Sequence, residues 1–526
     1  HTNLVGWQGE DRNPVFAPGD EKVYFLSERG GSFNIYSFNL TVPDRVEPVT
    51  SFKNRPVRFL SIANTGRLCF GYDGEIYIKD EMSKPKKVAV EIRGDQAIDD
   101  REELLFTSGA TDAEVSPDGK QIALILRGEV FVTSTDYVTT KQVTETPEQE
   151  KWLSFAPDNR TLAYASERDG NWNIYTAKMA RKEEINFPNA TLIDEEAVLP
   201  ASSVERFAPQ FSPDGKELAF IEDRNKLMVV NLQNKKVRQI TDGSMHYRTG
   251  DGFTYKWSPD GKWFALEFIG NKHDPYGDIG IVRADGGGQI INLTRSGYSN
   301  GNPRWVLDGN AILFSSERYG MRNHASWGSL EDVMIVFLNQ DAYDRFRLSK
   351  EDYELLKQEE KSAYKEEEKS EKQQRKAIVV ELKGIEDRIV RLTPSSSELG
   401  DAVLSREGEK LYYLASFEGG LGLWEMNLRS KNTRLMHKLN GNWGSLVLDK
   451  SGNNLFLLGS RNMQKINLQS DKQTPVVYRA MMELDKVAER AYMFDRVRRQ
   501  EAKRFYDKDM HGVDWPAVTK DYEKFL

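Results

Sequence analysis

A four-residue turn, Ser-Pro-Asp-Gly, occurs three times in this chain, at residues 116–119, 212–215 and 258–261. Proline presets the backbone angle of the first central turn position, aspartate suits the next one, and glycine adopts the left-handed conformation that reverses the chain. A strand-like run follows the turn, for example Glu217-Leu218-Ala219-Phe220. Each copy therefore predicts a β-hairpin.

Six weaker versions of this turn bring the number of predicted hairpins to nine. They begin at Ala17, Ala63, Ala156, Val306, Ser405 and Asp449. The spacing is roughly 40 to 56 residues, apart from one gap of roughly 100, and a four-stranded propeller blade needs about 40 to 50 residues. The repeat predicts an all-β chain built from consecutive β-propeller blades.

The segments between the turns support this prediction. Apolar and β-branched runs such as residues 22–26 and 121–126 have the character of buried strands. The phrases Ser-Glu-Arg at 27–29, 166–168 and 316–318 mark the next turn of a blade. More polar phrases that end at Thr241, Thr294 and Thr393 predict the fourth, outer strand.

Composition narrows the class of protein. The chain has 526 residues, 39% of them hydrophobic, so we expect two or more domains with substantial cores. The net charge of −8 argues against nucleic acid and against an anionic membrane as partners. Cys69 is the single cysteine, and no stretch approaches the roughly 18 apolar residues that a membrane span requires.

The order of the turns predicts three domains. Two blades fall within residues 1–92, and a polar stretch at 93–96 marks a boundary. Seven turns fall within residues 93–478, which is enough for a closed ring, whereas two blades cannot close one. The first two blades therefore belong to another propeller. Residues 479–526 are expected to be helical.

The helical prediction for the last segment comes from a change of period. From Met481 to Phe505 the apolar residues recur at about 3.6, which places five of them on one stripe. These are Leu484, Val487, Ala491, Phe494 and Val497. The chain starts at His1 without a methionine, and a helical pattern is still running at Leu526, so we expect a fragment with a further domain downstream.

A charged segment, residues 349–376, occupies the long gap between two turns. Its alternating charges at near-helical spacing predict a solvated helix or a partly disordered loop inserted between strands. A role as a lid or as a partner-binding segment is the alternative.

No motif in the chain predicts a catalytic, cofactor-binding or metal-binding residue. There is no Gly-x-Ser-x-Gly nucleophile elbow and no P-loop, and the six histidines lack zinc-ligand spacing. We interpret His246 and His324 as structural loop residues. Turn chemistry accounts for Asp118, Asp214 and Asp260, which a ring of blades holds too far apart to share calcium.

With two successive propellers and a helical tail, the chain resembles tricorn protease and its bacterial homologues, peptidase family S41. Residues 211–220 and 257–262 look like blades of that family, although TolB-type and prolyl oligopeptidase-type propellers share them. Residues 505–515, Phe-Tyr-Asp-Lys-Asp-Met-His-Gly-Val-Asp-Trp, look like the entry to the family's first core subdomain.

The resemblance implies the following expectations. Residues 1–92 are the end of a six-bladed propeller, and residues 93–478 are a seven-bladed one that gates peptides for a serine peptidase. The catalytic residues lie downstream of Leu526, and His511 does not take the role of the catalytic histidine, so residues 1–526 alone should show no cleavage that serine inhibitors block. The family suggests a homo-hexamer without cofactors, located in the cytoplasm or, in some bacteria, the periplasm.

Two other functions stay open. A TolB-like module would bind protein partners and catalyse nothing, but it carries one propeller after an α/β domain. The propeller half of a prolyl oligopeptidase-type enzyme would be followed by an α/β-hydrolase domain, whereas a charged helix follows the blades here.

Overall fold

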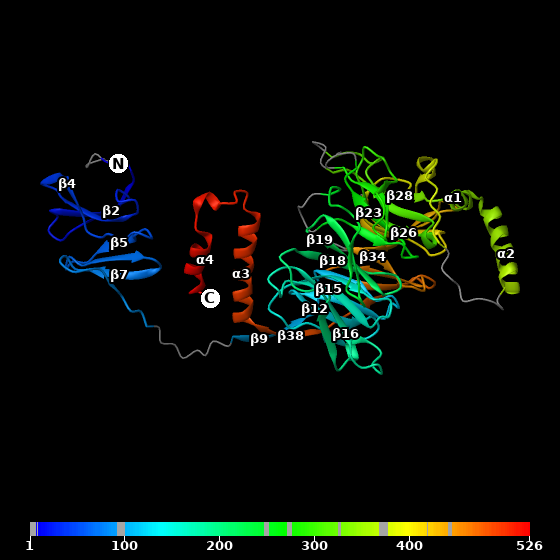
Figure 1. Cartoon of the computed structure of the whole chain (residues 1–526), viewed down its shortest axis with the longest axis horizontal. Coiled ribbons are helices and arrows are strands. Elements are labelled where there is room, and N and C mark those ends of the chain that lie inside the picture. The colour runs from blue at the N-terminus through cyan, green and yellow to red at the C-terminus, as the bar shows by residue number, and fades with distance from the viewer. Residues whose placement is uncertain are drawn as a thin grey trace. The chain divides into compact units, whose positions relative to one another are not determined.

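The computed structural model describes residues 7, 9–91, 100–246, 252–270, 276–323, 328–367, 377–417, 419–439 and 444–526. The chain divides into two compact units, His1–Ile98 and Asp99–Leu526. The described residues form nine four-stranded antiparallel sheets, one two-stranded sheet and short helices near the C-terminus (Figure 1). The predicted all-β propeller fold is confirmed.

The first unit contains two of the four-stranded sheets, each built from consecutive strands. The first sheet consists of β1 (Asp11–Phe16), β2 (Lys22–Ser27), β3 (Asn34–Asn39) and β4 (Val42–Pro48). The second consists of β5 (Arg58–Ile62), β6 (Leu68–Tyr72), β7 (Glu75–Lys79) and β8 (Lys86–Lys87). The boundary expected at 93–96 lies outside the described residues, and the assignment of these two sheets to a six-bladed propeller stays a prediction.

The second unit contains the other seven four-stranded sheets, blades 1 to 7 in chain order. Blade 1 is β10 (Asp112–Val115), β11 (Gln121–Leu126), β12 (Glu129–Ser134) and β13 (Thr140–Gln142); blade 2 is β14 (Glu150–Phe155), β15 (Thr161–Ser166), β16 (Asn173–Met179) and β17 (Ile193–Ala197). Blade 3 is β18 (Arg206–Phe211), β19 (Glu217–Glu222), β20 (Lys226–Asn231) and β21 (Val237–Gln239); blade 4 is β22 (Tyr255–Trp257), β23 (Trp263–Phe268), β24 (Asp278–Arg283) and β25 (Ile291–Asn292). Blade 5 is β26 (Asn300–Val306), β27 (Ala311–Ser316), β28 (Asp332–Phe337) and β29 (Ile389–Arg391). Blade 6 is β30 (Glu398–Leu404), β31 (Lys410–Phe417), β32 (Gly420–Asn427) and β33 (Thr433–Lys438); blade 7 is β34 (Ser445–Leu448), β35 (Asn454–Leu458), β36 (Met463–Asn467) and β37 (Lys472–Val476).

All nine predicted turns lie between the first and second strands of a sheet. In the Ser-Pro-Asp-Gly copy of blade 1, the Ser116 hydroxyl donates to Asp118 Oδ1 at 2.7 Å, and the same carboxylate accepts from the backbone N–H of Lys120. Gly119 has φ 69°, the left-handed conformation that the prediction required. The aspartates of these turns therefore stabilise the turns, and Asp260 also accepts from the backbone N–H of Ile378 at 3.1 Å.

The threonine that ends each fourth-strand phrase closes its blade. In blades 1, 3, 4 and 5 its hydroxyl accepts a hydrogen bond of 2.8–3.2 Å from the backbone N–H near the start of the third strand. These residues are Thr144, Thr241, Thr294 and Thr393. A short polar outer strand is thus attached to the blade without a large apolar face.

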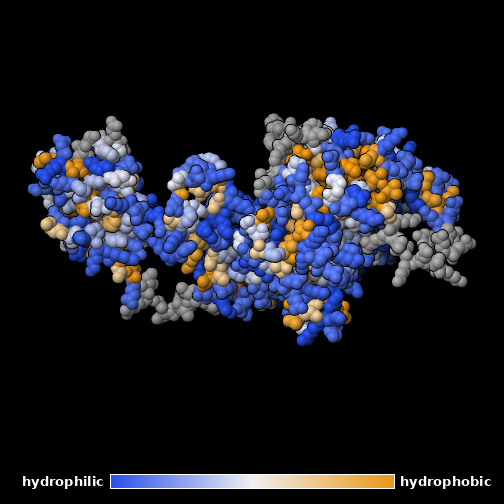
Figure 2. Space-filling model, in the orientation of Figure 1, coloured by the Kyte–Doolittle hydropathy of each residue, from blue (hydrophilic) through white to orange (hydrophobic). Residues whose placement is uncertain are grey.

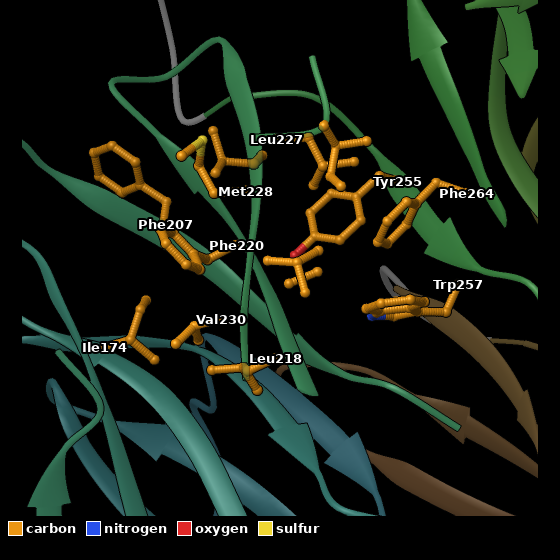
Figure 3. Close-up of a cluster of buried hydrophobic side chains, with 14 of the residues drawn as sticks. Ile174, Phe207, Leu218, Phe220, Leu227, Met228, Val230, Tyr255, Trp257 and Phe264 are labelled. Carbon is orange, nitrogen blue, oxygen red and sulfur yellow. The ribbon is translucent and has the colours of Figure 1, made fainter. Parts of the chain in front are cut away.

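Apolar side chains between neighbouring blades form the core. Figure 3 shows one such cluster, in which Ile174 of blade 2, Phe220 of blade 3 and Phe264 of blade 4 lie in a continuous layer. Blade 7 packs on blade 1 in the same way, through Phe456 and Leu124. The backbone N–H of Lys450 also donates to the carbonyl of Pro117 at 3.0 Å. These contacts close the seven blades into a ring.

A two-stranded sheet joins the ring to the C-terminal helices. The strand β9 (Arg101–Phe106) pairs in antiparallel fashion with β38 (Ala480–Asp485). The helix predicted from Met481 is therefore wrong over its first residues: Met482 and Leu484 are buried while Met481 and Glu483 are exposed, which is the period of a strand. The helix α3 (Lys486–Arg504) begins after Asp485, whose carboxylate caps it, and α4 (Trp515–Glu523) follows.

Leu484 of the predicted apolar stripe belongs to β38 and is buried, whereas the valines of the stripe, which lie in α3, face solvent. Val487 is 43% and Val497 59% exposed, and Figure 2 shows apolar patches where Figure 1 places α3 and α4. The opposite face of the helix contacts the blades through charged side chains. The buried carboxylate of Glu167 binds Arg496 and Arg499, and that of Glu205 binds Lys503. No helix of the described residues is long and apolar enough to cross a membrane.

The charged insertion of blade 5 is helical as far as the structure describes it. Residues 349–376 form α2 (Lys350–Glu367) and continue into 368–376, which lie outside the described residues; α1 (Gln340–Arg347) precedes this segment, and both helices lie between β28 and β29. Its start is not merely solvated: Tyr353 is 5% exposed, and Arg429 of blade 6 donates to the carbonyl of Leu348 at 2.9 Å. The insertion is therefore anchored on blade 6.

Candidate functional site

The first strand of every blade lies on the inside of the ring. First strands of neighbouring blades contact one another, as β10 does β14 and β30 does β34. The position two residues before each first turn pairs with an equivalent residue of the second strand, as in Glu114 with Ala123 and Lys256 with Ala265. We call these seven residues the wall positions. They are Glu114, Ser154, Gln210, Lys256, Arg304, Val403 and Val447.

Three of the inner strands carry a bulge just before the wall position. The register shifts in β14, β18 and β26, and one residue of each bulge is left-handed: Trp152 has φ 58°, Ala208 46° and Asn302 54°. A bulge opposes two residues to one and re-aims a side chain. The same local device thus recurs around the inner wall with three different side chains.

Charges on non-adjacent blades interact across the ring. Burial raises the pKa of Glu114 to about 7, and the nearby charges of Lys256 and Arg304 oppose that rise. Lys256 is exposed, yet partial removal from water lowers its pKa, while Glu114 raises it. Glu114 belongs to blade 1 and Lys256 to blade 4, so the space they share is the centre of the ring.

Arg304 links three blades along the inner wall. From blade 5 it donates two hydrogen bonds to the Asp401 carboxylate of blade 6, at 2.9 and 2.7 Å, and another to the carbonyl of Leu446 in blade 7, at 3.0 Å. Asp401 also accepts from the backbone N–H of Leu446 at 2.8 Å. A two-oxygen carboxylate and a guanidinium make a strong, directional pair. The positive charge of Arg304 is therefore largely neutralised.

Asp112 of blade 1 has the same role as Asp401 of blade 6. Its carboxylate accepts from the backbone N–H groups of Ala113, at 2.8 Å, and of Leu153 in blade 2, at 3.2 Å. Burial raises its pKa, and these hydrogen bonds oppose the rise. Both aspartates therefore join neighbouring inner strands.

A hollow of about 420 Å³ lies outside the ring, beside α3 and α4. Its cationic lining is paired: Lys503 lies 2.5 Å from Glu205, while Arg498 and Arg499 contact Asp495 at 2.5 and 2.6 Å. With its cations already compensated, this hollow is a weaker candidate for an anionic ligand than the inner wall.

Of the histidines considered in the sequence, His246 and His511 lie within the described residues, and neither is part of a catalytic group there. The Ser244 hydroxyl donates to Asp242, and the His246 ring lies 5.6 Å from that of Phe253. His511 Nδ1 lies 3.1 Å from Asp507 in an exposed turn, and His324 lies outside the described residues. Within the described ranges, no three His, Cys, Asp or Glu side chains are grouped to hold a metal ion.

Glu167 has a role that the sequence alone did not show. The Ser-Glu-Arg phrase at 166–168 marked only a turn, and the structure places Glu167 among the buried residues, 1% exposed. The hydroxyl of Tyr492 donates to it at 2.5 Å, and Arg496 Nε lies 3.1 Å away. Glu167 thus anchors α3 on blade 2, and we call this buried contact the helix seat. The basic side chains of α3 were the only hint of this contact.

Comparison with known proteins agrees with this architecture. A family model described as the Tricorn protease C1 domain matches residues 486–526. A Tricorn-like protease C-terminal subunit from Sulfurisphaera tokodaii is 22% identical over 530 residues, which cover 96% of this chain and 56% of the relative. The crystal structure of the tricorn protease matches with a TM-score of 0.69 at 15% identity, over 99% of this chain and 48% of that one. The chain is a homologue of tricorn protease.

The resemblance drawn from the turns and from residues 505–515 is therefore confirmed. Tricorn protease homolog 1 of Streptomyces coelicolor is 21% identical over 311 residues, which are 57% of this chain and 27% of the relative. The matched parts of the chain thus span just over half of the first of these tricorn relatives and about a quarter of the second.

Proposed function

We propose that this chain is the propeller region of a tricorn-type peptidase and that the centre of its seven-bladed ring guides extended peptides. The observation that carries the proposal is the inner wall, where Glu114, Lys256 and Arg304 of three different blades share the central space. Polar and charged side chains on a rigid ring can hold a peptide backbone, and a propeller centre excludes folded protein.

The activity of the parent protein forms the second part of the proposal. The names of the relatives and the C1 match at residues 486–526 support a peptidase. We assign serine-type peptide hydrolysis to it, with the catalytic groups outside these 526 residues, together with assembly into a homo-oligomer and a cytoplasmic location, with the periplasm as the alternative. The ring then acts before the chemistry, by admitting or rejecting chains.

Filling the inner wall tests the guiding role. Gln210→Trp places a large ring at the wall position of blade 3, where the native side chain is half-buried. We expect fluorescence anisotropy to show at least a tenfold loss of affinity for a labelled unstructured peptide of about ten residues, roughly 33 Å when extended. Ala201→Trp, in an exposed loop, is the matched control. Unchanged binding by Gln210→Trp would contradict the guiding role.

A further inference from the structure

The two cations at the wall positions differ in whether a hydrogen-bond or ion-pair partner lies against them. Arg304 is held by Asp401 and by the carbonyl of Leu446. Among the contacts of the described residues, neither a hydrogen bond nor an ion pair involves the ammonium of Lys256. Lys256 is therefore a wall cation without a direct partner.

The backbone under Lys256 is fixed from both sides. Its neighbours Tyr255 and Trp257 are buried, and they donate to the carbonyls of Ala208 and Gln210 in blade 3, at 2.5 and 3.2 Å. From blade 5, Trp305 Nε1 donates to the carbonyl of Lys256 itself, at 3.0 Å. Only the side chain of Lys256 is left free to move, so the ammonium is presented from a rigid base.

The surroundings of Lys256 favour an incoming anion. Desolvation among the inner strands lowers the pKa of Lys256, so a carboxylate that approached it would stabilise its charge. Three carboxylates share the space with it, but Asp401 is bound by Arg304 and Asp112 accepts two backbone N–H groups. Glu114, with a pKa of about 7, carries only part of a charge near neutral pH. A carboxylate on a passing peptide would find an ammonium that is not yet paired.

We propose that Lys256 determines specificity at the inner wall by favouring peptides that carry a carboxylate, on a side chain or at the C-terminus, over neutral and basic peptides. This inference rests on the proposed guiding function and deepens it, because it names the class of chain that the ring prefers. The wall positions of the other blades carry a paired cation, an acid, or uncharged side chains, so among the described residues Lys256 is the only one of the seven wall positions with a cation that lacks a direct partner.

Matched peptides and variants of the whole chain test this role. Four labelled peptides of equal length would differ only in central Glu, Gln or Lys residues with an amidated C-terminus, or central Gln with a free C-terminus. Anisotropy at low and at moderate salt would give their affinities. At low salt we expect the Glu peptide to bind about tenfold more tightly than the Lys peptide, and salt to reduce the difference. The free-C-terminus peptide separates a terminal from a side-chain carboxylate.

Variants of Lys256 assign the preference to one side chain. Lys256→Gln copies Gln210 of blade 3 and should remove the preference, Lys256→Arg should keep it, and Lys256→Glu should invert it. Lys178→Gln, an equal change of charge at an exposed site on the third strand of blade 2, should leave it unchanged. Circular dichroism and melting temperature verify that each variant is folded.

The outcomes separate the two proposals. If the wild-type chain binds all four peptides equally, or if Lys256→Gln keeps the preference, the role of Lys256 is refuted while the guiding function stands. If no peptide binds, the guiding function fails and the role of Lys256 fails with it. A preference lost in Lys256→Gln, kept in Lys256→Arg and kept in Lys178→Gln supports both.

Discussion

Two kinds of contact hold the second unit together, and they obey different rules. Between blades, contacts are apolar and continuous, as at Phe220, which is fully buried. Between the ring and α3, contacts are charged and local, as at Glu167 and Arg496. Apolar burial is non-directional and adds up over a large area, whereas a buried ion pair is costly to desolvate and depends on its geometry. The first kind builds the ring, and the second fixes the direction in which the chain leaves it.

The largest expected effect comes from breaking an interface between blades. Phe220→Ala removes a buried ring from the layer shown in Figure 3 and leaves a cavity, so we expect a loss of about 3–5 kcal/mol in unfolding free energy. Chemical denaturation with tryptophan fluorescence measures it. Phe16→Ala, at a side chain that is 57% exposed, is the control and should cost far less. Equal losses in the two variants would contradict the account of the core.

Removing the charge of the helix seat should have a smaller and more local effect. Glu167→Gln leaves Arg496 and Arg499 without their buried counter-charge, and we expect a loss of about 2–3 kcal/mol. Hydrogen exchange should show faster opening of α3 with little change in the blades. Glu317→Gln, in the same Ser-Glu-Arg phrase of blade 5, is the matched control. Protection lost equally throughout the ring would contradict a local seat.

Glu114, a wall carboxylate without an ion pair among the described residues, should make the stability of the folded chain depend on pH. The pKa of Glu114 is about 7, above its ordinary value of 4.5, so the folded chain keeps a proton that the unfolded chain releases. Its contribution to stability is therefore complete below pH 4.5 and is lost as pH rises through 7. We expect Glu114→Gln to be about 1–2 kcal/mol more stable than wild type at pH 8.

Melting curves at pH 5 and pH 8 measure this difference. At pH 5 the difference in melting temperature should be much smaller than at pH 8, since the loss of stability between pH 4.5 and 7 has only begun there. Glu28→Gln, in the first unit, is a control that should not change the pH dependence of the ring. A variant that gains no stability at pH 8 would show that the central space is well hydrated.

Much of the architecture could be predicted because it rests on local chemistry. The serine, proline, aspartate and glycine of each turn determine the backbone within four residues, and nine such turns marked nine sheets. The threonines of the outer strands were visible as well, although their hydrogen bonds were not. Residues 505–515 identified the family, and the match at 486–526 bears this out.

The rest depended on contacts that no short stretch contains. The pairing of β9 with β38 joins residues 101–106 to 480–485, so the second segment was predicted as helix from its own period. The apolar stripe of α3 was predicted from its period, but the side that contacts the ring was not, because the carboxylates that bind the opposite face lie more than 280 residues away in the chain.

Local turn chemistry in the sequence determined that this protein is a row of blades, because each hairpin forms from its own few residues. Only the tertiary structure decided which side chains meet at the centre of the ring. Glu114 and Lys256 are 142 residues apart, and neither has a neighbour in the sequence that indicates a shared site. Ring closure brings them within electrostatic reach and withdraws them from water, and desolvation of that kind is a property of the fold.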